Sequence, residues 1–192
     1  MKKIIFSTIV FLFICQMFSQ IKKQKATLIF KDGKELSCFA RISGKNVRYV
    51  ESDSRSSEIV VDEKDILGLK IYLNDKLLEF YYKKEEGKDK FKLMELVANG
   101  KIKLYRIQDV YSENISMNSN RSYMNQKFAS SKFFLISKTN PDEVIRLKQD
   151  FEEDAKNYFA DCKDLVNKLG QDNFRKKDIL TIVVFYNENC GE

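Results

Sequence analysis

Between residues 26 and 110, apolar side chains recur at every second position, which is the period of a half-buried β-strand. The clearest run places Leu36, Cys38, Ala40 and Ile42 on one face, and similar runs follow at 67–73, 78–82 and 91–97. Turn-forming pairs separate the runs: Asp32-Gly33, Ser43-Gly44, Asn74-Asp75 and Asn99-Gly100. Strands at this spacing predict an antiparallel β-meander that curls into a barrel or a sandwich.

The pair Asn99-Gly100 is the strongest turn signal, because it readily adopts the positive φ angles of a type I′ hairpin. Beyond it, residues 112–130 are polar and predict an exposed loop. Residues 132–137 predict another strand, the only proline (Pro141) marks a turn, and residues 144–147 predict a short strand.

The hydrophobic period changes from two to between three and four at Gln149. A single helix is predicted, ending at Gly170, with these residues on its apolar face: Phe151, Ala155, Tyr158, Phe159, Cys162, Val166 and Leu169. A second helix is predicted over 179–186, capped by Asp178 and apolar nearly all round, so we expect it to be buried. The pattern predicts an α+β protein, with an antiparallel β domain over 20–148 and a C-terminal helical hairpin over 149–192 packed on it.

The first nineteen residues have the layout of a secretory signal peptide. A basic start (Lys2, Lys3) precedes an apolar run over 4–15, and Ser19 is a small residue at the expected cleavage point. Two alternatives are an uncleaved anchor, for which the apolar run is short, and a lipid anchor at Cys15, which Ile14 disfavours. We therefore expect an exported protein that is periplasmic, attached to the outer envelope or secreted, with no transmembrane span after signal removal.

The charge pattern argues against nucleic acid as a partner. Loss of Lys2 and Lys3 with the signal peptide lowers the formal net charge from +6 to +4. The lysines alternate with acidic residues, as on a solvated face, and no arginine-rich stripe is present.

The cysteines fit an oxidising compartment. Cys162 lies on the apolar face of the first predicted helix, and Cys190 follows the second. Two antiparallel helices would bring these positions together, so we predict a Cys162–Cys190 disulfide, which would contribute about 3–4 kcal/mol. Cys38 lies on the inward face of its strand and is predicted to be a buried free thiol.

Three C-terminal segments (158–165, 174–179 and 184–190) and the opening segment 26–33 resemble an uncharacterised family of exported proteins from Bacteroidota. These proteins often carry a proline after the helix cysteine, where this chain has Lys163. The resemblance implies export and a β-rich domain followed by two helices with paired cysteines. It implies no activity.

The residues that commonly carry catalysis are few. The chain has no histidine, which excludes Ser-His and Cys-His nucleophiles and histidine-containing metal sites. No glycine-rich phosphate-binding motif or C-x-x-C pair occurs, and the only S-x-x-K (Ser19 to Lys22) spans the predicted cleavage point. The acidic run 150–154 lacks the spacing of an EF-hand loop. The sequence therefore predicts no cofactor and no metal.

Two groups of residues remain as candidates for a site. A glycosidase needs two carboxyl groups across a cleft, and Glu79 and Glu95 lie in otherwise apolar strands. The alternative is that Glu95 pairs with Lys103 across the predicted hairpin. Tyr72, Tyr81 and Tyr105 form a candidate binding face for sugars or apolar partners, the alternative being half-buried cross-strand pairs.

Two classes of function follow. The first is an exported non-catalytic binding or structural module of the cell envelope, whose partner is a protein, a glycan or a lipid. The second is a carboxylate-dependent hydrolase that acts on envelope glycan. The absence of a catalytic motif in this short chain favours the first, so we do not expect an enzyme.

Overall fold

The computed structural model describes residues 23–51, 57–73, 75–116, 123–147 and 150–190. The predicted signal peptide (1–19), Cys15 and the Ser19–Lys22 pair lie outside these residues, as does Asn74 of one predicted turn. In the described part of the chain, no helix combines the length and the apolar character that a membrane crossing requires.

Ten described strands form one sheet, followed by a helical segment, which confirms the predicted α+β fold. The order of strands across the sheet is β10-β9-β8-β7-β6-β5-β1-β2-β3-β4, and all neighbours in this order are antiparallel. The strands are β1 (Gln24–Phe30), β2 (Glu35–Ser43), β3 (Asn46–Val50), β4 (Ile59–Val61), β5 (Ile66–Leu73), β6 (Lys76–Glu85), β7 (Phe91–Ala98), β8 (Leu104–Ser116), β9 (Tyr123–Ile136) and β10 (Glu143–Ile145).

Strands β1 to β5 form an N-terminal curl around their own core. Leu28, Cys38, Ala40 and Leu69 are buried there, together with Tyr82 of β6. The inward residues of β2 are those that the period-two pattern predicted, which confirms the prediction for this strand. Gly44 adopts a φ of +62°, which allows a two-residue turn between Ser43 and Asn46.

Strands β6 to β10 close into a second structure, which we call the ring. Besides its antiparallel pairing with β9, β10 pairs in parallel with β6, where Glu143 lies opposite Lys84. This pairing joins the first and last strands of the run β6-β7-β8-β9-β10. Side chains fill the interior, as in other small barrels: Met94, Tyr105, Phe134 and Val144 are all buried.

At β5 and β6, the face of the sheet that packs on a core changes from one side to the other. Phe80 packs against the core of the curl, whereas its neighbour Tyr81 packs against the core of the ring. Gly68 lies opposite Tyr81, and a Cβ atom at Gly68 would lie 2.1 Å from the backbone oxygen of Phe80. A side chain is therefore excluded where the two structures meet.

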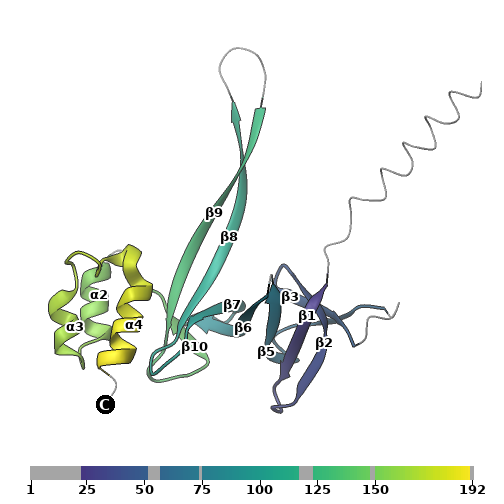
Figure 1. The fold of residues 1–192 in the computed structure, drawn as a ribbon, viewed down its shortest axis with the longest axis horizontal. Helices are drawn as coiled ribbons and strands as arrows, with labels where there is room; N and C mark the ends of the chain where they lie inside the picture. Colours follow the sequence, from purple (N-terminus) through teal and green to yellow (C-terminus); the bar gives the residue numbers. More distant parts are fainter. Residues whose placement is uncertain (1–22, 52–56, 74, 117–122, 148–149, 191–192) are drawn as a thin grey trace, which may run out of the picture.

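The prediction of an exposed loop over 112–130 is wrong. Strands β8 and β9 pair continuously from Leu104–Leu135 to Ser116–Tyr123, and the hairpin extends beyond the rest of the sheet (Figure 1). Alternating apolar residues report the burial of one face, whereas strand pairing needs only backbone N–H and C=O groups. A polar sequence can therefore form this ladder. Residues 117–122 lie outside the described part.

The turn predicted at Asn99-Gly100 is present, but its expected type I′ geometry is wrong. A five-residue connection, 99–103, joins β7 to β8, and Gly100 does not have a positive φ. A Cβ atom at Gly100 would instead lie 2.6 Å from the side chain of Asn187. The glycine thus serves the close approach of a helix rather than a tight turn.

The helices are α2 (Phe151–Tyr158), α3 (Lys163–Lys168) and α4 (Ile179–Asn189), and together we call them the helical cap. The prediction of a single helix over 151–169 is wrong, because the helix is interrupted at residues 159–162, between α2 and α3. Phe159 and Cys162 are both buried, and the break keeps them on the side that faces the sheet. Gly170, with a φ of +88°, follows the last turn of α3, as expected for a helix end.

Helix α4 begins where it was predicted and extends to Asn189. Asp178 stands at its N-cap position, but its carboxylate accepts a hydrogen bond from the backbone N–H of Arg175 instead of capping α4. The expected burial on all sides is wrong, since Leu180 and Val184 are 46% and 39% exposed. The buried face packs with α2 and α3 on Ile102, Leu104 and Leu135 of the ring.

Candidate functional site

A pocket of about 440 Å³ lies between the helical cap and the base of the β8–β9 hairpin, and we call it the helix–hairpin pocket. Leu104 and Leu135 form part of its floor, where they lie opposite one another in the ladder. Phe151 at the start of α2 and Ile179 at the start of α4 complete the buried apolar lining. Phe133 and Leu147 are half-buried at its sides.

The rim of this pocket is cationic. Four exposed side chains, which we call the rim cations, come from three separate segments: Lys132 from β9, Arg146 from the chain after β10, and Lys176 and Lys177 from the 3₁₀ turn before α4. Among the described residues that line the pocket, none is Asp or Glu. The N-terminal end of α4 also lies here, but the carboxylate of Asp178 at its N-cap position offsets the positive end of the helix dipole, so the positive charge of the rim comes from the four side chains.

Two other hollows on the described surface have a different character. One, lined by Glu85, Glu86, Asp154, Lys88 and Arg146 among others, mixes both signs of charge. The other, at the start of α2, is lined by Asp150, Glu152 and Glu153 as well as two cations. The helix–hairpin pocket therefore stands apart from both by its uniform charge and its apolar floor.

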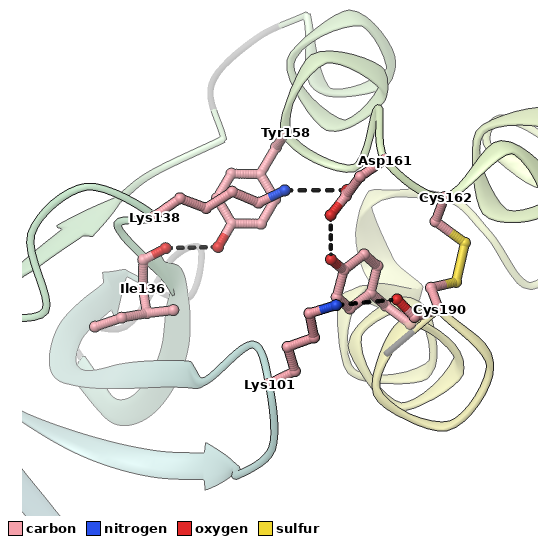
Figure 2. A network of polar contacts seen from close by, with 8 residues as sticks. Lys101, Ile136, Lys138, Tyr158, Asp161, Cys162 and Cys190 are labelled. Atoms are coloured by element: carbon pink, nitrogen blue, oxygen red, sulfur yellow. Dashed lines mark hydrogen bonds and ion pairs between the residues drawn. A yellow bond between two sulfur atoms is a disulfide. The ribbon is translucent and has the colours of Figure 1, made fainter. Parts of the chain in front are cut away.

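A polar network ties the cap to the sheet beside the disulfide (Figure 2). Asp161 accepts hydrogen bonds from Lys138 at 3.0 Å and from the hydroxyl of Tyr186 at 2.5 Å. The hydroxyl of Tyr158 donates to the carbonyl of Ile136. The ammonium group of Lys138 also lies 5.1 Å from the centre of the Tyr158 ring, within the range of a cation–π contact.

The network favours a structural role over acid–base chemistry. Desolvation alone would raise the pKa of Asp161, but the hydrogen bonds from Tyr186 and Lys138 outweigh it and lower that pKa. The carboxylate therefore stays ionised and accepts hydrogen bonds rather than donating a proton. Burial, followed by the bond to Asp161, raises the pKa of Tyr186 to about 12, so this phenol stays neutral.

The predicted disulfide between Cys162 and Cys190 is present, with its two Cα atoms 5.5 Å apart. It joins the break between α2 and α3 to the end of α4. Cys38 is buried and free, as predicted, and burial raises the pKa of its thiol to about 11. A thiol in this state is a packing residue rather than a nucleophile.

The three candidate tyrosines share one face of the sheet. Paired residues of neighbouring strands point to the same face, as do residues two positions apart along a strand, and the pairing from β5 to β8 links the three tyrosines in this way. Their exposure differs. Tyr105 is buried inside the ring, and Tyr81 packs against it edge-on at 6.5 Å. Of the three, Tyr72 alone is exposed, at 49%, next to the exposed Leu77.

The two candidate carboxylates are kept apart. Glu79 lies opposite Lys70, and Glu95 lies opposite Phe80, the next residue along β6, so the two point to opposite faces of the sheet. Glu95 forms a bidentate pair with Arg106, its neighbour in the ladder, rather than with Lys103. Glu79 accepts a hydrogen bond from the hydroxyl of Tyr81. These two residues cannot flank the same glycosidic bond.

Among the described residues, no group of three or more His, Cys, Asp or Glu side chains is placed to hold a metal ion. Sequence reasoning missed the helix–hairpin pocket, although the adjacent Lys176 and Lys177 between two helices were a visible signal. No protein-family model, curated protein or solved structure matches this chain.

Proposed function

We propose that this protein is an exported, non-catalytic binding module of the cell envelope, and that its ligand occupies the helix–hairpin pocket. The observation that carries the proposal is the pocket itself: a recessed apolar floor surrounded by polar groups from several segments. Small-molecule sites in proteins combine these features at volumes of about 300–1,000 Å³. The disulfide is compatible with export, because such bonds persist in oxidising compartments.

The rigidity of the surroundings supports a binding role. The floor belongs to the ladder of β8 and β9, and the disulfide holds the cap that forms the opposite wall. A site built on paired strands and a cross-linked helix keeps its shape before the ligand arrives, which lowers the entropic cost of binding. The alternative function, a hydrolase acting through Glu79 and Glu95, has no such support, since these residues point to opposite faces.

A pocket-filling variant tests the proposal. Ser131 is an exposed residue of β9 that lines the pocket, so Ser131→Trp should occupy it. Ser37 is an exposed strand residue of β2 in the curl, and Ser37→Trp is the matched control. The wild type, exported from a bacterial host and examined by native mass spectrometry, should carry a small-molecule adduct. The adduct should disappear in Ser131→Trp and remain in Ser37→Trp.

Binding can also be located directly. When a total extract of envelope lipids and glycans is added to the isotope-labelled protein, NMR shifts should concentrate at Leu104, Leu135 and Ile179. Shifts that gather instead around Tyr72 and Leu77 would move the binding site to the tyrosine face. An adduct that survives in Ser131→Trp, or turnover of a glycan substrate by the wild type, would contradict the proposal.

A further inference from the structure

We infer that the ligand of the helix–hairpin pocket is a small anionic amphiphile: one apolar chain with a carboxylate or phosphate head group. This inference rests on the proposed function and names the chemical class of the ligand. It follows from two properties that occur together in this pocket alone among the hollows described above: an apolar floor and a rim on which every charged side chain is positive.

The rim selects the charge of the head group. Lys132, Arg146 and the Lys176-Lys177 pair approach the mouth from different segments, so their potentials add over one small volume. A concave site lined by a single sign of charge concentrates counter-ions of the opposite sign. Arginine and lysine both bind carboxylate and phosphate oxygens through charge-assisted hydrogen bonds. A cationic head group would be repelled at this position.

The floor selects the remainder of the ligand. Leu104, Leu135 and Ile179 are at most 5% exposed, and Phe151 closes the same side of the pocket. The apolar side chains of the pocket that water still reaches are Phe133 and Leu147, which are half-buried at its sides. An inorganic anion would leave their exposed parts in contact with water, whereas an alkyl chain would cover them and would itself leave water. Burial of apolar surface is worth about 25 cal/mol per Å², so the chain should supply much of the affinity.

The geometry also favours a small ligand over an extended one. The rim cations surround a single mouth. A site for a nucleic acid backbone would instead present its cations along an extended stripe. The apolar floor is recessed behind them, whereas a protein that lies on a membrane presents its apolar residues outward. We therefore assign the site to one molecule that enters the pocket.

The first test compares two single-chain ligands that differ in head-group charge. Dodecanoate and dodecyltrimethylammonium are titrated below their critical micelle concentrations, with calorimetry for affinity and NMR of the Leu104, Leu135 and Ile179 methyl groups for location. We expect dodecanoate to bind at the pocket and the cationic compound to bind at least about tenfold more weakly, a difference that one charge contact can provide. Equal affinities would overturn the anionic class and leave the pocket as the binding site.

The second test changes the rim. The variant Lys176→Glu/Lys177→Glu should weaken dodecanoate binding by about tenfold or more and narrow the preference over the cationic compound. Added acidic residues before α4 suit its dipole, so the variant should fold. The control Lys31→Glu/Lys90→Glu makes the same change in net charge at two exposed lysines that are not among the residues lining the pocket, and should bind like the wild type.

Further outcomes separate the two proposals. If dodecanoate does not bind but the envelope adduct is still lost in Ser131→Trp, the ligand class is wrong and the binding function stands. If dodecanoate does not bind and no adduct depends on Ser131, both the ligand class and the binding function of the pocket are wrong. Binding to phosphatidylglycerol vesicles without binding to dodecanoate monomers would assign the rim to a membrane surface and overturn the inference.

Discussion

The N-terminal curl and the helical cap are held in place by different kinds of interaction. The curl is a run of neighbouring strands, in which Leu28, Ala40 and Leu69 pack together across hydrogen-bonded partners. The cap meets the ring through an apolar face and a few polar contacts between residues far apart in the chain, such as Asn187 and Ile102. It also carries the disulfide, whereas Cys38 in the curl is free.

This difference indicates which of the two regions unfolds locally first. Strand pairing distributes the stability of the curl over many similar contacts, so no single polar group decides its position. Besides its apolar face, the cap is held by a small number of specific polar contacts and one disulfide, and each of these can be removed by substitution. Removing them should loosen the cap while the curl stays folded, because stability is not uniform across a structure.

The disulfide offers the largest effect. Replacing both Cys162 and Cys190 by Ser removes a cross-link between residues 28 positions apart. The free energy of unfolding should fall by about 3 kcal/mol, because the unfolded chain regains the freedom that the cross-link removed. Urea denaturation measures the loss, and amide hydrogen exchange should increase in α3 and α4 before it increases in β1 and β2. Equal acceleration in both regions would contradict the comparison.

The second largest effect should come from removing the side chain of Asn187. Its side chain accepts a hydrogen bond from the N–H of Ile102 at 2.8 Å and donates one to the carbonyl of the same residue at 2.9 Å. Asn187→Ala should destabilise the protein by about 2 kcal/mol, because both backbone groups of the buried Ile102 lose their partner. Chemical denaturation gives the value.

Asn189→Ala is the matched control, because Asn189 is exposed and donates only to the carbonyl of Phe185 within its own helix. We expect this variant to change stability by less than about 0.5 kcal/mol. If the two variants lost the same stability, Asn187 would not be a tie between cap and ring.

The smallest effect is a pH dependence that arises at Asp161. Its pKa is lowered in the folded protein, so its contribution to stability is present above the unfolded value and is lost as the pH falls below about 4. The unfolding free energy of the wild type should therefore decrease on acidification. Asp161→Asn should show a shallower decrease over the same range.

Asp89 offers the control for this measurement. It is an exposed residue of the connection between β6 and β7 and is not a member of the polar network around Asp161, so Asp89→Asn should keep the acid slope of the wild type. A slope in Asp161→Asn as steep as in the wild type would mean that the network beside the disulfide does not contribute to the acid sensitivity of the protein.

How well each part of the fold could be predicted depends on how far apart in the sequence its contacting residues lie. Strands β2 and β5 of the curl, the start of α4, the buried Cys38 and the Cys162–Cys190 pair could be predicted, because each depends on periodicity within a short segment or on two helices joined by a short connection. The polar part of the β8–β9 hairpin (112–116 and 123–130) and the interruption of the helix at 159–162 could not. Their residues lack a local hydrophobic pattern that would distinguish them from a loop or a continuous helix.

The candidate site was decided by tertiary structure. Where it is present, hydrophobic alternation determined which side of a strand is apolar, since burial of one face imposes that period on the local sequence. It could not determine that β10 returns to pair with β6, or that residues near 104, 133, 147 and 177 meet around one pocket. Such contacts depend on the path of the whole chain, because the burial that stabilises them is shared among segments that carry no common sequence signal.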